Sequence, residues 1–326
     1  MLRDRRVMVT GGAGFIGSCL TAELLTRNCR VTVVDDFSAG TRGNLRRLGR
    51  NSALKVVEMD LKRPRGLAEL VREQDLIFHL AANPEVRVGE TEPKVHFEEN
   101  VVVTFNLLEA VRQSGGGKTM VFTSTSTVYG EASQIPTRED YGPLIPISTY
   151  GASKLACEAL ISSYVNTFNN RALILRLANV VGLRSRHGVI FDFVKKIVAS
   201  PEELEILGDG TQEKSYMYIS DLIGAMMHLT GLFQESSEKT AVYNVGSKDK
   251  IMVKEIAGIV AREMAHPKIC LRFTGGVDGG RGWRGDVKNM QLSIEKLLRT
   301  GWEPRYLSRQ AVKLAAHELL HEICRH

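Results

Sequence analysis

The sequence predicts an α/β fold built on a doubly wound parallel sheet, and three observations support this. Short β-branched runs alternate with helical patterns through the first half of the chain. A glycine-rich turn, Gly11–Gly17, joins the first of these runs to the first helical pattern. The alternation then repeats several times, and repeated β-α-β units fold into parallel sheets with right-handed crossovers. We therefore expect helices on both faces of one sheet, with a smaller α/β domain added.

The expected strands are short, apolar and rich in β-branched residues, as buried parallel strands are. In order they are Arg6–Thr10, Arg30–Asp35, Leu54–Met59, Leu76–Leu80, Thr119–Thr123 and Leu173–Leu177. Between them, apolar residues recur at helical spacing. These expected helices are Ile16–Arg27, Leu67–Glu73, Val101–Gln113 and Tyr150–Thr167.

The rhythm changes after about Gly182, where loops rich in glycine and charge separate the helical patterns. These patterns are Ile190–Ala199, Val253–Met264 and Arg309–Ile323. Val242–Val245 has the composition of one more strand of the first sheet, so the two domains should interleave. We expect the first domain to comprise residues 1–178 plus about 216–246, and the second about 179–215 plus 247–326.

Composition and charge exclude several classes of protein. The 326 residues are 43% hydrophobic and 25% charged, which is ordinary for a soluble globular protein. No apolar run approaches the roughly 20 residues that span a bilayer, and no signal-peptide core precedes the first strand, so we expect a cytoplasmic protein. The net charge of +6 is mild. The basic cluster Arg42–Arg50 lacks interleaved aromatic residues, so it does not indicate nucleic-acid binding. It is either a solvated loop or a field that attracts an anionic substrate.

The glycine-rich turn matches the pattern Gly12-x-Gly14-x-x-Gly17 after a strand and before a helix, which is the Rossmann dinucleotide-binding context. Glycines let the backbone approach a pyrophosphate, and the helix N-terminus attracts that anion. Asp35 ends the second strand eighteen residues beyond Gly17, where a carboxylate accepts from ribose hydroxyls and repels a 2′-phosphate. We therefore predict NAD, although Arg42 keeps NADP as an alternative.

Tyr150 and Lys154 form the strongest candidate for catalytic chemistry. They are four residues apart in an expected helix, so both side chains should stand on one face. An adjacent ammonium favours the phenolate, which makes Tyr150 a candidate base near neutral pH. Beside a dinucleotide, such a base would take a proton from a substrate hydroxyl while the cofactor takes the hydride. The pair predicts redox chemistry on an alcohol.

Together, several motifs resemble the extended short-chain dehydrogenase/reductase family. They are the glycine turn, Asp35, His79–Asn83, Asn100, the segment Thr123–Gly130 and the Tyr150/Lys154 pair. Within that family the chain is most similar to nucleotide-sugar epimerases, and closest to UDP-galactose (UDP-glucose) 4-epimerases. The resemblance implies that NAD lies against Gly11, Gly14, Phe15, Ile16, Gly17, Asp35, Asp36, Asp60, Leu61, Leu80, Ala81, Ala82, Asn100, Tyr150 and Lys154.

The resemblance also implies a substrate site. Thr125 would bond the sugar 4′-oxygen and share its proton with Tyr150, and Lys154 would lower the pKa of Tyr150. The residues implied to hold the UDP-sugar are Val86, Thr125, Asn179, Leu207, Lys214, Arg281 and Asp286. Two positions depart from the family pattern: Lys214 stands where relatives carry arginine, and Trp283 stands where they carry the diphosphate arginine. We therefore assign that second role to Arg281, inside the glycine-rich stretch Gly275–Gly285, which has the character of a binding loop.

The residues after Thr125 narrow the expected reaction. Ser126 and Thr127 stand where the family's dehydratases and decarboxylases carry acidic residues, so those reactions lose their proton donors. The resemblance implies interconversion of UDP-glucose and UDP-galactose through transient oxidation at C4′, with a related nucleotide sugar such as UDP-GlcNAc as the alternative. Met290 stands at the position that gates N-acetyl sugars, and flexible methionine decides poorly between them. Family members pair the two helices Val101–Gln113 and Tyr150–Thr167 across a dimer interface, so we expect a homodimer.

Two other interpretations remain open at the level of sequence. The string His317-Glu318-Leu-Leu-His321 matches the zincin pattern, although we expect it to be an exposed terminal helix without a metal. Five scattered cysteines without a C-x-x-C pair indicate no zinc site either. A dinucleotide-sensing regulator of the same fold is the second alternative, and the presence of both Tyr150 and Lys154 argues against it.

Overall fold

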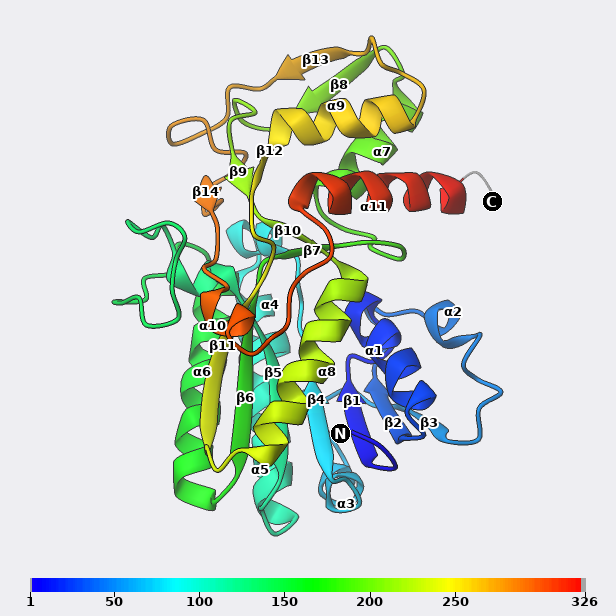
Figure 1. Ribbon diagram of the computed structural model, residues 1–326, viewed down its shortest axis with the longest axis vertical. Helices are drawn as coiled ribbons and strands as arrows, with labels where there is room; N and C mark the ends of the chain where they lie inside the picture. The colour runs from blue at the N-terminus through cyan, green and yellow to red at the C-terminus, as the bar shows by residue number, and fades with distance from the viewer. Residues whose placement is uncertain (1, 324–326) are drawn as a thin grey trace. The chain divides into compact units, whose positions relative to one another are not determined.

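The computed structural model describes residues 2–323. Its largest sheet has seven strands (Figure 1). The strand order is β11-β6-β5-β4-β1-β2-β3. β1 pairs in parallel with β2 and β4, β2 pairs with β3, and β4 pairs with β5. The strands are β1 (Arg6–Thr10), β2 (Arg30–Asp35), β3 (Leu54–Glu58), β4 (Leu76–His79), β5 (Thr119–Thr125), β6 (Arg171–Leu177) and β11 (Thr240–Val245). The predicted doubly wound α/β fold is confirmed.

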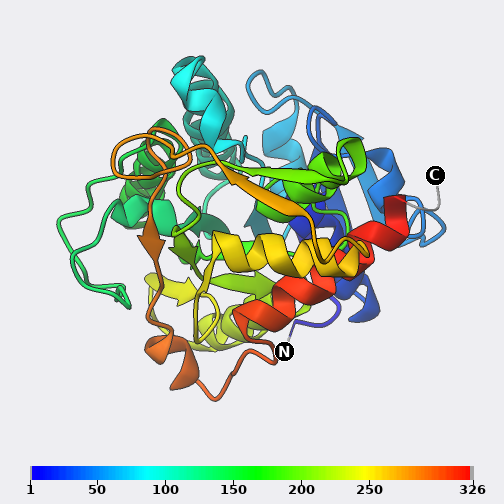
Figure 2. The same ribbon diagram turned by 90° about the horizontal axis from the view of Figure 1, so that it is seen from above.

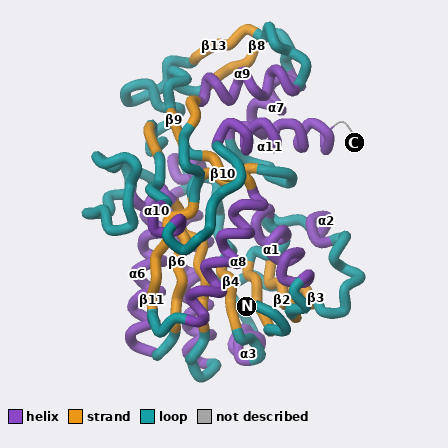
Figure 3. The backbone as a smooth tube through the Cα atoms, in the orientation of Figure 1, coloured by secondary structure: helices purple, strands orange, loops and turns teal. Residues whose placement is uncertain are grey.

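Helices cover both faces of this sheet. One face packs on α3 (Leu67–Arg72), α5 (Val103–Gln113) and α6 (Thr149–Phe168), whose buried residues share a hydrophobic cluster with Met8, Ile77 and Phe122. In Figure 1, α1 (Phe15–Thr26) and α8 (Ile219–Glu235) lie on the opposite face, and Figure 3 shows the alternation of helix and strand. The short helix α2 (Arg42–Leu45) follows β2.

Two local predictions differ from the structure. Leu54–Met59 was expected to be a buried strand, but β3 is the edge strand and Val56 is 40% exposed, because only one neighbour covers it. The helix expected from Val101 begins only at Val103. It is preceded by a 3-10 turn at Val86–Glu90, a short helix α4 (Pro93–His96) and a π-helical turn at Phe97–Val102. Such π turns often occur at functional positions.

The remaining elements lie outside the seven-stranded sheet, and several of them share a second hydrophobic cluster. They are a 3-10 turn at Ser126–Tyr129, β7 (Asn179–Val181), α7 (Val189–Ala199), β8 (Glu203–Ile206), β9 (Glu213–Lys214), β10 (Tyr216–Tyr218), β12 (Ile251–Met252), α9 (Val253–Glu263), β13 (Cys270–Phe273), β14 (Asn289–Met290), α10 (Glu295–Leu298) and α11 (Ser308–Ile323). The pairs are β7 with β10, β8 with β13, and β9 with both β12 and β14. Helices α7, α9 and α11 enclose one hydrophobic core, and Figure 2 shows α9 beside α11.

The chain divides into two compact units. Unit 1 comprises Met1–Thr125, Ala152–Arg176 and Ile223–Tyr243, and unit 2 comprises Ser126–Gly151, Leu177–Leu222 and Asn244–His326. The units interleave along the chain, but Ser126–Gly151 packs with unit 2 rather than with the sheet, unlike the division we expected from sequence. The hydrogen bond from the Tyr129 hydroxyl to Asn244 Oδ1 (2.8 Å) is one contact that places this segment there. None of the described helices combines the length and apolar composition that crossing a membrane requires.

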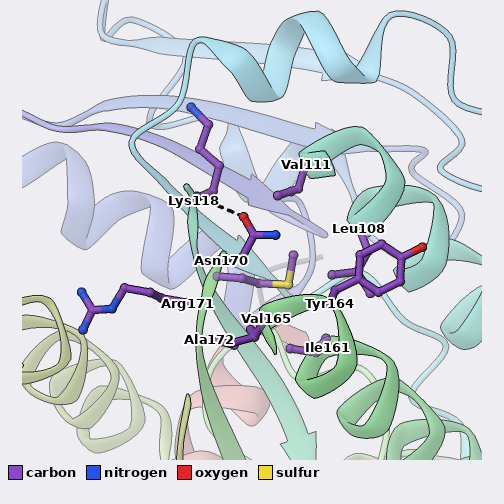
Figure 4. Close-up of a pocket in the computed structure, with 10 residues that line it drawn as sticks. Leu108, Val111, Lys118, Ile161, Tyr164, Val165, Asn170, Arg171 and Ala172 are labelled. Carbon is purple, nitrogen blue, oxygen red and sulfur yellow. Dashed lines mark hydrogen bonds between the residues drawn. The ribbon is translucent and has the colours of Figure 1, made fainter. Parts of the chain in front are cut away.

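One small cavity in unit 1 lies where β5 and β6 begin (Figure 4). Leu108, Ile161 and Tyr164 line it from helices α5 and α6, and the Lys118 amide donates to Asn170 Oδ1 (3.3 Å) at its rim. Its interior of about 10 Å³ is comparable to a single water molecule. It is also at the amino end of the strands, whereas ligands of such sheets bind at the carboxyl end. It is therefore a packing defect rather than a ligand site.

Candidate functional site

The glycine turn after β1 forms a cradle from backbone alone. Gly11 has a φ of +68°, and its carbonyl accepts the Gly14 amide at 3.1 Å. A Cβ on Gly17 would lie 2.1 Å from the Gly11 carbonyl oxygen, so no other residue fits without moving the loop. The turn leads directly into Phe15 and Ile16 at the start of α1. A glycine-lined helix N-terminus of this kind fits a dinucleotide pyrophosphate.

Asp35 is held in place at the end of β2. Its side chain is only 7% exposed, and its two carboxylate oxygens accept from the Ala13 and Phe37 amides, both at 2.8 Å. Burial raises the pKa of Asp35, while the two amides act in the opposite direction. Each oxygen retains a lone pair for a hydroxyl donor. The carboxylate is therefore fixed and ready to receive a ribose.

The neighbouring charges bear on the choice between NAD and NADP. Asp36 is exposed and accepts from the Ser38 amide at 3.0 Å in a local turn. Arg42, which kept NADP as an alternative, forms an ion pair with Glu58 and lies over the Phe37 ring at 4.2 Å. Its charge is therefore already matched by a carboxylate. This arrangement favours NAD.

Asp60 and Leu61 follow the third strand, as expected, but they differ in exposure and in what they contact. The Asp60 side chain is 45% exposed and its carboxylate accepts from the Lys62 amide at 2.8 Å. Leu61 is 5% exposed and belongs to the hydrophobic core. The Leu61 carbonyl accepts from Asn106 Nδ2 at 2.8 Å. The Leu61 side chain therefore has a packing role, and only its backbone could meet a ligand.

Asn100 connects two parts of the expected cofactor site. It lies in the π-helical turn, 1% exposed, where its Oδ1 accepts the Asn83 amide (2.8 Å) and its Nδ2 donates to Ser153 Oγ (2.8 Å). Asn83 ends the segment that carries Leu80, Ala81 and Ala82, all half-buried, and Ser153 immediately precedes Lys154. One amide side chain thus joins the end of β4 to helix α6.

Lys154 is a buried cation. It is 3% exposed and its Nζ lies 4.4 Å from the centre of the Phe122 ring. Burial lowers the pKa of Lys154 to about 8, with Cys157 and Glu158 acting in the opposite direction. His79, buried nearby on β4, has its pKa lowered to about 3 by burial and by the Lys154 charge, so it is neutral. A desolvated ammonium acts strongly on any group that approaches it.

The buried His79 also organises the strand ends. Its Nδ1 lies 2.7 Å from Thr10 Oγ1 and its Nε2 lies 2.9 Å from Thr104 Oγ1. Thr10 Oγ1 accepts the Leu80 and Ala81 amides at 3.2 and 3.3 Å, so its own proton points to His79. His79 Nδ1 therefore accepts this hydrogen bond, and the single ring proton of the neutral imidazole is on Nε2. His79 and Thr10 together therefore hold the backbone that follows β4 in place.

The other two candidate catalytic residues lie at the ends of neighbouring elements. Thr125 is the last residue of β5 and is 8% exposed. Tyr150 is the second residue of α6, one helical turn before Lys154, so the predicted spacing on a single helix is confirmed. Thr125 and Lys154 belong to unit 1 and Tyr150 to unit 2. The hydroxyl at the strand end and the lysine on α6 are both on the sheet's carboxyl side.

In unit 2, the charged candidate substrate residues Lys214, Arg281 and Asp286 all form ion pairs. Lys214 on β9 pairs with Asp286, whose side chain is 3% exposed. Arg281 donates through Nε to the Asp286 carbonyl (3.1 Å) and pairs through Nη2 with Glu131. The Lys214 ammonium also lies 5.5 Å from the centre of the Trp283 ring. The two positions that depart from the family pattern thus come together around one buried carboxylate.

The remaining candidates lie on separate segments. Asn179 opens β7 and its Nδ2 donates to the Ser215 carbonyl at 3.1 Å. Leu207 follows β8, is half-buried, and its carbonyl accepts from Gln212 at 3.0 Å. Met290, on β14, is 9% exposed. Val86 begins the 3-10 turn of unit 1 and is half-buried.

The zincin-like string has a structural role in unit 2. Glu318 accepts from the Tyr218 hydroxyl (2.6 Å) and the Leu183 amide (3.0 Å), so its carboxylate is already bonded. His317 and His321 are exposed with their Nε2 atoms 3.1 Å apart, and the described residues hold no group of three metal ligands. The helix itself was expected to be exposed, but Ala315 and neighbouring apolar residues are buried in the unit 2 core.

Several residues of this site were not found by sequence reasoning. Ser153 was hidden inside the Tyr150–Lys154 motif, and Glu131 lies in a loop without pattern. The buried group of Ser124, Glu158 and Arg176 was also missed, although Ser124 and Glu158 lie beside the residues that were found. The only signal was a charged residue on the buried face of a helix, which is rare unless the charge is paired.

Comparison with known proteins identifies relatives over the whole chain. The NAD dependent epimerase/dehydratase family matches residues 7–246. The crystal structure of a UDP-galactose 4-epimerase is 42% identical, with a TM-score of 0.85 over 98% of this chain and 99% of its own. The UDP-glucose 4-epimerase of Corynebacterium glutamicum is 30% identical over 80% of this chain and 81% of its own length.

Relatives with other substrates match at comparable identity. The UDP-N-acetylglucosamine 4-epimerase of Methanobrevibacter ruminantium is 26% identical, with a TM-score of 0.85 over 98% of this chain and 99% of its own. A UDP-glucuronic acid 4-epimerase of Bacillus cereus, solved with NAD, is 28% identical. A UDP-glucuronic acid decarboxylase of Arabidopsis thaliana is 31% identical. Similarity alone therefore leaves the sugar open.

Proposed function

Because this chain belongs to the NAD-dependent epimerase/dehydratase family, we propose that it interconverts UDP-glucose and UDP-galactose by transient oxidation at C4′. The observation that carries the proposal is the buried Lys154 ammonium one helical turn from Tyr150. That cation stabilises a phenolate, and the phenolate is the base that oxidation of an alcohol needs. Sugar chemistry follows from the family, and the site chemistry follows from these two side chains.

Each residue in the proposed mechanism holds or moves a proton. Tyr150 accepts the proton of the 4′-hydroxyl, and the Thr125 hydroxyl bonds the same oxygen and relays the proton. Lys154 stabilises the phenolate, and Asn100 fixes the backbone before Lys154 through Ser153. Bound NAD supplies the acceptor and the donor for the hydride. After the keto sugar has rotated, C4′ would receive the hydride back on its opposite face, and Tyr150 would return the proton to the 4′-oxygen, which completes the epimerisation.

The same residues argue against loss of water or carbon dioxide. Ser126 and Thr127, which follow the catalytic threonine, offer hydroxyls and no carboxylate. A UDP-N-acetylhexosamine remains the second candidate substrate, because Met290 at the proposed gate is flexible and the methanogen relative acts on UDP-N-acetylglucosamine.

A product analysis tests the proposal. The purified protein is incubated without added cofactor with UDP-galactose, UDP-N-acetylglucosamine and UDP-glucuronic acid in parallel, and the sugars are separated. We expect the C4 epimer of UDP-galactose to form fastest. A 4-keto-deoxy sugar or a pentose product would contradict the proposal, and fastest turnover of the N-acetyl or uronic sugar would move it to that substrate.

We also propose a homodimer formed through α5 and α6. Phe105 and Phe168 on these helices are 43% and 37% exposed, and the Tyr164 ring contacts both. An exposed aromatic cluster of this kind favours association. Sedimentation should show a dimer for the native protein and a monomer for Phe105→Glu. A native monomer at micromolar concentration would rule this interface out.

A further inference from the structure

A second buried ionic group lies beside the proposed catalytic residues in unit 1. Glu158 on α6 accepts from Ser124 Oγ on β5 at 2.5 Å, and from Arg176 on β6 through Nη2 at 2.7 Å and Nε at 3.1 Å. The side chains of Glu158 and Arg176 are each 7% exposed, and Ser124 is 3% exposed. One carboxylate therefore ties a helix to two neighbouring strands.

Such a group is difficult to explain by stability alone. Removing two charges from water is costly, and apolar residues of similar size often serve a core at least as well. A buried ion pair with fully made hydrogen bonds does, however, define one geometry. Here the ion pair defines how α6 is placed against the ends of β5 and β6.

The two residues joined by this bond, Ser124 and Glu158, are both close in sequence to proposed catalytic residues. Ser124 immediately precedes Thr125, and Glu158 lies one helical turn beyond Lys154 on the same helix face. The bond between Ser124 and Glu158 therefore sets the distance from the strand end that carries the hydroxyl to the turn that carries the ammonium. A shift of about 1 Å between reacting groups is enough to slow a reaction about a hundredfold.

Charge gives the group a second effect. The groups that face Lys154 are Cys157 and Glu158 on its own helix and neutral His79 on β4. Without Arg176, the Glu158 carboxylate would stabilise the Lys154 ammonium but would oppose formation of the Tyr150 phenolate. Because Arg176 pairs with that carboxylate, the pair contributes little net field, and Lys154 remains the effective cation.

We propose that Glu158 is a positioning residue, which fixes Thr125 against Lys154 through Ser124 and whose charge Arg176 cancels so that the Tyr150 phenolate forms near neutral pH. The inference rests on the proposed function for its catalytic consequence. Its structural part concerns only the described contacts of β5, β6 and α6.

Opposite charge changes supply the decisive test. In Arg176→Met the uncompensated Glu158 carboxylate opposes the phenolate, so the acidic limb of the kcat–pH profile should move to higher pH. In Glu158→Gln the Arg176 guanidinium is no longer balanced by the Glu158 carboxylate and favours the phenolate, so the same limb should move to lower pH. The double variant Glu158→Gln/Arg176→Met carries neither charge and should return to the native limb. Shifts in the same direction, or no shift in either single variant, would overturn the proposal.

The tether is tested separately, with Ser124→Ala. This variant keeps both charges, so kcat should fall about tenfold or more with KM and the pH limb unchanged, since only the alignment of Thr125 is lost. Arg176→Lys keeps both the charge and the bond between Ser124 and Glu158, so it should retain the native pH limb and most of the native kcat. A native kcat in Ser124→Ala would show that the bond does not position Thr125.

A readout that needs no substrate separates this inference from the proposed function. Amide hydrogen exchange at Thr125 and Lys154 should accelerate in Ser124→Ala, while exchange in α11 of unit 2 stays unchanged. If the native protein turns over no nucleotide sugar and exchange still accelerates, the tether stands and the proposed function fails. If exchange at both amides stays at the native rate, the tether itself is wrong.

Discussion

The two compact units hold their polar groups in different ways. In unit 1, Asp35, Asn100 and Lys154 are at most 7% exposed and are fixed by backbone amides, a serine and an aromatic ring. In unit 2, the side chains of Lys214 and Arg281 are more exposed, at 16% and 20%, and each is paired with a carboxylate. The polar groups of unit 1 are thus held mainly by neutral partners, whereas the two cations of unit 2 are held by carboxylates.

This difference separates two tasks. A cofactor that stays bound is served by a rigid, prebuilt cradle, because little ordering remains to be done on binding. A substrate that enters, turns and leaves is served by charges that can change partners. We therefore expect affinity for the cofactor to depend on the backbone geometry of unit 1, and affinity for the substrate to depend on the ion pairs of unit 2. The following substitutions test each side of it.

The largest effect is expected at Tyr150, which lies in the unit 2 segment of the helix that carries Lys154 in unit 1. Tyr150→Phe removes the proposed base and keeps the ring, so kcat should fall about 10²–10⁴-fold with nucleotide-sugar and NAD binding retained. Tyr164→Phe on the same helix, which loses a hydroxyl bonded to Glu109, is the matched control. A near-native rate for Tyr150→Phe would remove this residue from the mechanism.

Lys154→Met tests whether the buried ammonium, which the proposed chemistry needs, lowers the free energy of unfolding. Burial lowers the pKa of Lys154 from 10.5 to about 8, which corresponds to about 3 kcal/mol against the charged form. Below pH 8 the free energy of unfolding of the variant should therefore be higher than that of the native protein, and the variant should lose turnover. From pH 8 to 10.5 the native lysine loses its proton before the unfolded one does, so the difference should shrink.

Denaturant titrations at pH 7 and pH 10 measure this difference, with exposed Lys55→Met as the control. Equal stability of native protein and Lys154→Met at both pH values would show that the buried ammonium carries no such cost.

Gly17→Ala tests the backbone cradle. The added Cβ meets the Gly11 carbonyl oxygen, so the turn must open, and NAD affinity should fall about 10- to 100-fold, as overpacking by about 1–3 kcal/mol implies. In Gly43→Ala on α2 the added Cβ has an ordinary neighbour at 3.6 Å, and NAD binding should stay native. Calorimetric titration with NAD distinguishes the two, and equal affinities would contradict the cradle.

The smallest effect is expected in unit 2. Arg281→Met removes a side chain that, on our proposal, leaves Glu131 before it binds a phosphate. The lost ion pair offsets part of the binding free energy that Arg281 contributes. KM for UDP-galactose should therefore rise about tenfold, with kcat little changed. Arg284→Met, in the same loop and exposed, is the control. A larger fall in kcat than rise in KM would show that Arg281 acts in the chemical step instead.

Sequence patterns predicted unit 1 more completely than unit 2. The ranges of β1 and β2 match the expectation residue for residue, because buried parallel strands have a strong local signature. The glycine turn and the Tyr150/Lys154 spacing are local as well. The edge position of β3 and the π-helical turn around Asn100 were not predictable, because neighbour pairing and helix register depend on the rest of the sheet.

The alternation of strands and helices, the cradle glycines and the helix that carries Tyr150 and Lys154 can all be predicted from local sequence, because each follows from residues within one or two turns of one another. Which charged side chains form ion pairs depends instead on long-range packing. Lys214 pairs with Asp286 across 72 residues, and Arg281 pairs with Glu131 across 150. A charged side chain in a loop has no periodic signature, so its partner is set by the packing of distant segments.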